Sequence, residues 1–153
     1  MHKIEDYSAE DFISGDWVVD LQYPEMPLQV LYPMDDGLRL KHSFTWDENS
    51  KPVRLDIPSK IDYSMVGLIQ IDRSIMEKIG FKDDGMYAFI DLGDQKYAKY
   101  YHYLNRFEVI WEGIDDRENN SYQRDVIFCA TCKTVDQLHH VFKMANINIE
   151  IKL

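Results

Sequence analysis

The sequence predicts an α+β protein: a mostly antiparallel, strongly bent or barrel-like sheet of about eight to nine strands, with short helices and one C-terminal helix packed on it. Three observations support this fold class. Short segments with alternating apolar and polar residues recur along the chain. The connections between them are short and rich in Gly, Pro, Asn and Asp, which favours antiparallel pairing. A longer amphipathic segment follows near the C-terminus.

The first part of the chain predicts one short helix and four strands. Ser8 and Asp11 have the spacing of a helix cap, and Gly15 ends the helix early. Prolines at 24 and 27 should interrupt the first strand region, and Pro58 should end the last. We expect a hairpin across the turn at residues 33–37. The strands are expected over residues 17–21, 28–32, 38–46 and 53–57.

A strand over residues 65–71 should be followed by a short helix over residues 72–80. Ser74 and Glu77 are spaced as a capping box, and Gly80 suits the left-handed position after the helix. Phe81 can then fold back on the last turn as the hydrophobic contact of that ending.

Residues 86–113 form the densest aromatic and β-branched stretch of the chain and predict a three-stranded meander. The strands are expected over residues 86–92, 96–104 and 106–112. Residues 96–104 also fit helical spacing, which leaves a central helix as the alternative. We favour the strand because tyrosines are dense there and because Asn105 is a turn residue.

The C-terminal part predicts a strand over residues 122–129, a helix and a last strand over residues 147–151. Thr134 and Gln137 are spaced as a capping box, the helix should run to Ala145, and Asn146 can take the left-handed position after it. The apolar face should leave three polar side chains pointing outward. These are His139, His140 and Lys143.

A chain of 153 residues predicts a single globular domain over residues 1–153. The N-terminus has acidic residues where a signal peptide would have a positive start, and no window approaches the roughly 18 apolar residues of a membrane span. Only two cysteines occur, so no disulfide framework is expected. We therefore expect a cytoplasmic protein without a membrane partner.

The net charge of −10 points away from nucleic acid as a partner, because phosphate contacts require a basic face. Acidic residues are concentrated near the N-terminus, where residues 1–25 hold seven of them against one lysine. The same charge is compatible with a basic protein partner, although keeping the chain soluble is its more common role. A homodimer is also compatible with the sequence.

Cys129 and Cys132 form a CxxC motif between a predicted strand and a predicted helix. Over about twenty residues this arrangement resembles the active site of thioredoxins, in which the helix N-terminus lowers the pKa of the first thiol. The thioredoxin fold continues with two more strands and a helix, whereas only residues 146–153 remain here. A zinc site with His139 or His140 is a second interpretation, and two small buried apolar side chains are the third.

Gly15, Asp16 and Trp17 form a Gly-x-Trp motif after a short helix. The motif is similar to the one that opens lipocalins, and the predicted order of about eight strands, a helix and a last strand is similar as well. The resemblance implies a closed barrel with the tryptophan at one end, and a pocket that binds a small apolar ligand.

The sequence contains no HExxH, GxSxG, P-loop or GxGxxG motif, so an enzyme is not the preferred interpretation and no cofactor or metal is expected. An enzyme with an unrecognised site stays open. Paired aspartates lie beside glycine or in a polar loop and are most simply turn residues. These pairs are Asp35 with Asp36, Asp83 with Asp84 and Asp115 with Asp116.

The leading hypothesis is a small acidic protein-binding module, similar in kind to an inhibitor or an immunity protein that neutralises or regulates a partner. Tyrosines, tryptophan and a few cations are enriched in interface cores, and the meander carries them on both faces of its strands. Covering of one face by the C-terminal helix is the simpler alternative. The expected partner-binding residues are Tyr97, Lys99, Tyr101, Tyr103, Asp115 and Asp116.

Overall fold

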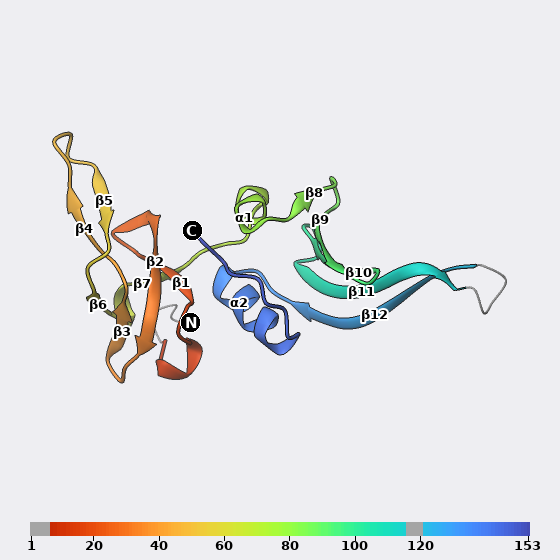
Figure 1. Ribbon diagram of the computed structural model, residues 1–153. Coiled ribbons are helices and arrows are strands. Elements are labelled where there is room, and N and C mark those ends of the chain that lie inside the picture. Colours follow the sequence, from red (N-terminus) through yellow and green to blue (C-terminus); the bar gives the residue numbers. More distant parts are fainter. Residues whose placement is uncertain (1–6, 116–120) are drawn as a thin grey trace. The chain divides into compact units, whose positions relative to one another are not determined.

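A computed structural model describes residues 7–115 and 121–153 of the chain. The chain divides into two compact units, which are described separately below (Figure 1). Unit 1 comprises Met1–Gln70 with Thr134–His140, and unit 2 comprises Ile71–Lys133 with Val141–Leu153. The chain therefore passes between the units three times, the last time within its C-terminal helix. The expectation of a single globular domain over residues 1–153 stays a prediction.

Unit 1 is built on a five-stranded antiparallel sheet with the strand order β6-β3-β2-β1-β7. The predicted hairpin across residues 33–37 is confirmed, since Val30 pairs with Leu40 and the Met34 N–H donates to the Gly37 carbonyl over 2.8 Å. The strands are β1 (Trp17–Asp20), β2 (Tyr23–Pro33), β3 (Gly37–Leu40), β6 (Ser59–Asp62) and β7 (Val66–Leu68), with a separate hairpin of β4 (Ser43–Trp46) and β5 (Pro52–Leu55).

Two boundaries in unit 1 differ from the sequence prediction for identifiable reasons. Strand β2 continues past Pro24 and Pro27, because both lie in an irregularity between the Asp20–Tyr23 and Val18–Leu28 pairs, where no ladder N–H is required. The predicted strand over residues 38–46 is divided into β3 and β4. It breaks at His42, where the imidazole Nδ1 accepts from the Gln29 N–H over 3.1 Å in place of a backbone carbonyl.

One face of the unit 1 sheet carries a continuous apolar core. Two short 3-10 helices close it, η1 (Ala9–Asp11) and η2 (Tyr63–Met65). Phe12 follows η1 and stacks on Tyr63 of η2, with ring centroids 6.2 Å apart. The core thus forms from residues brought together across the sheet. Its buried members are Phe12, Val18, Leu28, Val30, Leu38, Leu40, Ile61, Tyr63 and Val66.

Unit 2 is a second five-stranded antiparallel sheet with the order β12-β11-β10-β9-β8. The meander is confirmed and the helical alternative for residues 96–104 is wrong, since Lys96–Tyr101 pairs along both neighbouring strands. The β11–β12 hairpin extends well past β9 and β10 (Figure 1). The strands are β8 (Lys82–Asp83), β9 (Tyr87–Gly93), β10 (Lys96–Tyr101), β11 (Arg106–Asp115) and β12 (Ser121–Thr131).

The core of unit 2 shows which face of the meander is covered. Tyr100 and Phe107 are buried on the face that carries Ala88 and Ala98, and Phe107 contacts Phe142 of the C-terminal helix with centroids 5.5 Å apart. The Tyr100 hydroxyl donates to the Cys132 carbonyl over 2.9 Å, and burial raises the pKa of Tyr100 to about 12. Tyr100 is therefore a core residue of the sheet.

The short helix α1 (Arg73–Ile79) ends as predicted but begins with a different cap. Gly80 is left-handed at φ 110°, and the Phe81 N–H donates to the Met76 carbonyl over 3.0 Å. The cap is Asp72, whose carboxylate accepts from the Ile75 N–H over 2.8 Å, rather than Ser74. Asp72 is favoured because its carboxylate also complements the helix dipole.

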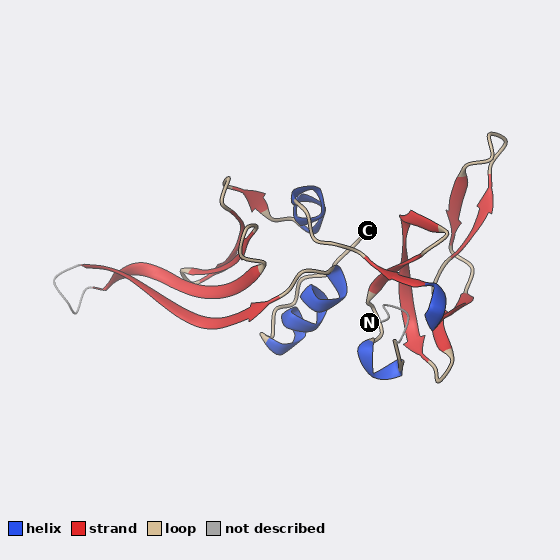
Figure 2. Cartoon of the chain, turned by 180° about the vertical axis from the view of Figure 1, so that it is seen from behind, coloured by secondary structure: helices blue, strands red, loops and turns tan. Residues whose placement is uncertain are grey.

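The C-terminal helix α2 (Val135–Met144) is confirmed, and so is the role of Asn146, which has φ 57°. The last predicted strand, over residues 147–151, is wrong: the chain after α2 is a loop (Figure 2). The Ile147 N–H donates to the Phe142 carbonyl over 2.8 Å, which closes the helix end. Ile151 is buried while Glu150 and Lys152 are exposed, so the alternation reflects burial without strand pairing.

The α+β class and the antiparallel pairing are confirmed, but the barrel-like detail is wrong. Each five-stranded sheet is open, with β6 and β7 at the two edges of one sheet and β12 and β8 at the edges of the other. The strand series is divided where α1 interrupts it, so the strands form two separate sheets in place of one continuous sheet. The lipocalin alternative thereby loses its structural basis. Neither α1 nor α2 is long and apolar enough to cross a bilayer, and no other helix of the described residues is.

Candidate functional site

The predicted partner-binding residues of β10 lie on the sheet face of unit 2 opposite the core. Tyr97, Lys99 and Tyr101 alternate with the buried Ala98 and Tyr100. The two outer tyrosines are half-buried, and Lys99 is buried. The face is thus ordered by contacts among its own side chains.

Lys99 is held by one carboxylate and one aromatic ring. Its Nζ lies 2.7 Å from Oε1 of Glu112 and 4.6 Å from the centroid of the Tyr87 ring. Burial opposes the charged form of Lys99, but the hydrogen bond to Glu112 keeps the lysine pKa above its ordinary value. The Lys99 hydrogen bond likewise lowers the pKa of the Glu112 carboxyl. The ammonium therefore stays charged and paired.

Glu108, on the same face, is a buried carboxylate that contacts two arginines. Arg124 donates to its Oε2 over 2.7 Å, and Arg106 Nε lies 2.9 Å from its Oε1. Arg124 also donates to the Tyr101 hydroxyl over 2.9 Å. Tyr101 consequently belongs to the ion-paired network of this face.

Tyr103 occupies a different environment, because it lies in the turn after β10 and is 80% exposed. Leu104 and Met86 are also large exposed apolar side chains, and the His102 N–H donates to the Met86 carbonyl, which brings the two turns together. We call Met86, Tyr103 and Leu104 the turn patch. Of the two predicted aspartates, Asp115 is the last residue of β11, and Asp116 lies outside the described residues.

The CxxC motif shows two cysteines in different environments. Cys129 is exposed on β12 and Cys132 is buried, and burial raises the pKa of the Cys132 thiol to about 12. A nucleophilic thiol requires the opposite shift, so Cys132 is not suited to be the nucleophile of such a motif. For Cys132 the interpretation as a buried apolar side chain is therefore the one that the structure favours.

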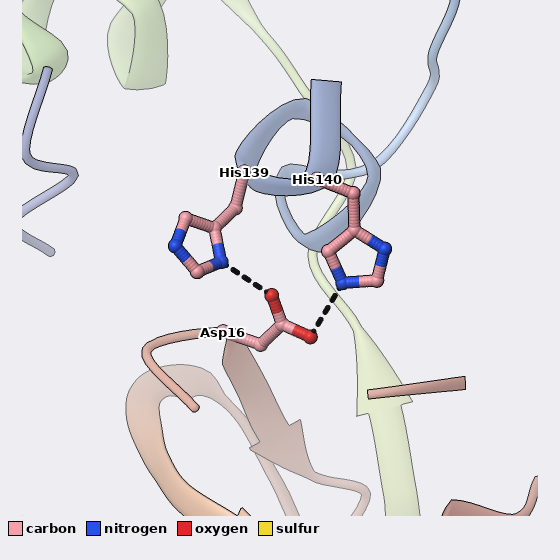
Figure 3. A group of neighbouring side chains, drawn as sticks. All are labelled: Asp16, His139 and His140. Atoms are coloured by element: carbon pink, nitrogen blue, oxygen red, sulfur yellow. Dashed lines mark hydrogen bonds and ion pairs between the residues drawn. The ribbon is translucent and has the colours of Figure 1, made fainter. Parts of the chain in front are cut away.

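A second candidate site lies in unit 1, where Asp16 contacts two consecutive histidines of α2 (Figure 3). Asp16 precedes β1 and is completely buried. Its Oδ1 lies 2.6 Å from Nδ1 of His139, and its Oδ2 lies 2.8 Å from Nε2 of His140. The two rings thus approach the carboxylate from either side with different nitrogens. We call these three residues the Asp16 cluster.

The backbone around Asp16 fixes the carboxylate and makes room for one ring. The Ile13 N–H donates to Oδ2 over 2.9 Å, and the Val30 N–H donates to the Asp16 carbonyl over 2.8 Å. Gly15 has φ 94°, and a Cβ atom there would lie 3.1 Å from the His139 ring. Glycine is therefore required at position 15 for both its conformation and its lack of a side chain.

Asp136 adds a second buried carboxyl near the Asp16 cluster. It lies in the first turn of α2 and is buried, and its Oδ1 makes no hydrogen bond within the described part of the chain. Burial raises the pKa of Asp136, the charge of Asp16 raises it further, and the neighbouring Thr134 hydroxyl and His140 oppose this. The buried region around α2 is therefore rich in acidic groups.

Sequence reasoning missed the Asp16 cluster. It placed His139 and His140 on the outer face of the helix, which is wrong, since both rings are partly buried against Asp16. In the sequence, Asp16 is only the middle residue of a Gly-x-Trp motif. Trp17 itself is buried and stacks on His42 with centroids 5.8 Å apart. The available signals were an acidic residue beside a tryptophan and a pair of consecutive histidines. The acid and the histidines lie more than 120 positions apart in the chain.

Comparison of the chain with protein-family models, with curated proteins and with solved structures finds no match.

Proposed function

We propose that the protein acts by binding another, basic protein, in the manner of an inhibitor or an immunity protein. The turn patch is the observation that carries this proposal. Tyr103, Leu104 and Met86 are each exposed by more than 60%, and Tyr and Met are enriched at protein interfaces. A backbone hydrogen bond from His102 to Met86 joins the two turns that carry them, and patches of exposed apolar side chains are typical of interaction sites.

The turn before β9, which carries Met86, is held in place by side-chain contacts. This favours a preformed binding surface. Arg73 contacts the Asp83 carboxylate over 2.6 Å and donates to the Gly85 carbonyl over 2.6 Å. Because the supporting turn is already held, less conformational entropy is lost on association than for a mobile loop. Tyr103 then offers a rigid aromatic anchor.

The charge of the chain determines which partner we propose. A net charge of −10 attracts a basic protein and accelerates its association at low ionic strength. The outer face of the meander contributes few free charges, because Lys99 is paired with Glu112 and because Glu108 is paired with two arginines. Tyr103 is therefore the residue of the predicted set on which a partner would depend most.

Affinity capture with three forms of the protein tests this proposal. Wild type and Tyr32→Ala, an exposed tyrosine of unit 1 that serves as the matched control, should retain the same basic protein from the native host. Tyr103→Ala should lose it, and raising the salt to about 0.5 M should weaken the retention by wild type. Retention of the partner by Tyr103→Ala, or capture of no salt-sensitive protein by wild type, would contradict the proposal.

A further inference from the structure

We propose that Asp16, His139 and His140 bind a divalent first-row transition-metal ion, such as Zn²⁺, in unit 1. The three ligand atoms are Nδ1 of His139, Nε2 of His140 and an Asp16 carboxylate oxygen, and all lie within 4.8 Å of one another. The two imidazoles approach the carboxylate from opposite sides (Figure 3). This inference is independent of protein binding by the turn patch.

The donor set determines the class of ion. Two imidazole nitrogens and one carboxylate oxygen suit Zn²⁺, Fe²⁺, Co²⁺ or Ni²⁺, whereas Mg²⁺ and Ca²⁺ prefer oxygen ligands throughout. Three protein ligands leave at least one coordination position open for water. The site therefore resembles in type a centre with an exchangeable ligand more than a closed structural one.

The three ligand atoms have to change their spacing when an ion binds, because the present contacts are hydrogen bonds. A tetrahedral ion with bonds of about 2.0 to 2.1 Å separates neighbouring ligand atoms by about 3.3 Å. The contacts of 2.6 Å to Oδ1 and 2.8 Å to Oδ2 would lengthen by about 0.7 and 0.5 Å. The two ring nitrogens, which lie within 4.8 Å of each other, would move to about 3.3 Å as well. His140 is 30% exposed in its side chain, which allows an ion to enter from solvent.

The protons balance without a co-reactant. Each neutral imidazole can donate its N–H to Asp16 in the hydrogen-bonded state, and a metal requires the lone pair of that same nitrogen. On binding, the proton of each ring moves to its other nitrogen, which is Nε2 in His139 and Nδ1 in His140. The Asp16 carboxylate then loses two N–H donors and gains a bond to the metal ion.

The surroundings of the Asp16 cluster favour a cation and hold the ligands in place. Asp16 is completely buried, and the Ile13 N–H fixes one of its oxygens, which is the kind of outer contact that orients metal ligands. The buried Asp136 carboxyl lies close enough for its charge to interact with Asp16 and His140, and one of its oxygens is unpaired within the described residues. A divalent ion would compensate this acidic region.

Titration of the untagged, metal-free full chain with Zn²⁺ and separately with Co²⁺ tests the inference. We expect one ion per chain and, for Co²⁺, visible absorption bands that report nitrogen and oxygen ligands. His140→Gln and His139→Asn should each bind at least tenfold more weakly. His102→Gln, which removes a histidine from unit 2, should bind as wild type does.

A measurement on the unsubstituted chain keeps the inference testable if a variant fails to fold. Zn²⁺ should shift the ¹⁵N resonances of His139 Nδ1 and His140 Nε2 and leave those of His42 and His102 unchanged. Absence of Zn²⁺ and Co²⁺ binding, equal binding by wild type and both histidine variants, or shifts confined to other histidines would overturn the proposal.

Discussion

Two buried carboxylates, one in each unit, are stabilised by different kinds of partner. Asp16 in unit 1 contacts two histidines, and Glu108 in unit 2 contacts two arginines. Both acids are less than 10% exposed. A guanidinium is always charged and has no lone pair to offer, whereas an imidazole can donate, accept or bind a metal.

The difference indicates what each region is built for. The arginines of unit 2 have side chains about 40% exposed, so they hold Glu108 from the solvent side and form a stable outer face. The histidines of unit 1 are more enclosed and belong to a helix, which holds their ring nitrogens around one point. Of the two arrangements, only the imidazoles of unit 1 can move a proton to the other ring nitrogen and offer a lone pair to an ion.

The largest expected effect follows from removing the acid of unit 1. Asp16→Ala should lower the free energy of unfolding by about 4 kcal/mol, because the Ile13 N–H and two imidazole N–H groups lose a fully buried acceptor. Urea unfolding followed by circular dichroism measures this. Asp16→Asn keeps the shape and one acceptor and should cost clearly less. If Asp16→Ala lowered the free energy of unfolding by less than Glu108→Ala does, the comparison between the two acids would be wrong.

A smaller effect is expected from crowding one histidine. Gly15→Ala should cost about 2 to 3 kcal/mol, because position 15 has φ 94° and the new Cβ would lie 3.1 Å from His139. The control is Gly93→Ala, at φ 85° with no atom within 4 Å of the new Cβ, which should cost about 1 kcal/mol. Equal costs in urea unfolding would mean that the His139 ring moves aside freely.

Removing the acid of unit 2 should cost less than removing that of unit 1. Glu108→Ala is expected to cost about 1 to 2 kcal/mol, because Arg106 and Arg124 can turn into solvent once the carboxylate is gone. The same urea experiment measures it. If residues 1–153 form one domain, this variant and Asp16→Ala should both shift a single transition, and two separate transitions would show that the units unfold independently.

The smallest effect is a pH dependence of the outer face of unit 2. The Lys99 hydrogen bond lowers the pKa of Glu112, so the carboxylate stabilises the fold above its unfolded pKa near 4.5, and this is lost as the pH falls through the lower folded value. Glu112→Gln should therefore be less stable than wild type at pH 7, and the difference should shrink below about pH 4. Thermal unfolding at both pH values measures it. A difference that is unchanged between pH 7 and pH 3 would contradict this assignment.

Local patterns predicted much of the fold. The hairpin across residues 33–37, the meander and the end of α1 at Gly80 follow from turn residues and alternation within a few positions. Two errors in strand extent arose where another hydrogen bond used a backbone N–H that would otherwise pair with a strand. After β3, the His42 imidazole accepts the Gln29 N–H. The Ile147 N–H donates to a carbonyl at the end of α2 and not to a neighbouring strand.

The sequence by itself determined the antiparallel α+β class, the acidic charge and the C-terminal ends of both helices, because these depend on neighbouring residues and on composition. Only the tertiary structure decided which residues meet. It divided the strands into two open sheets, paired Lys99 with Glu112, exposed Tyr103 and brought Asp16 to His139. Contacts between residues so far apart in the chain depend on how sheets and helices pack, and no local periodicity encodes that packing.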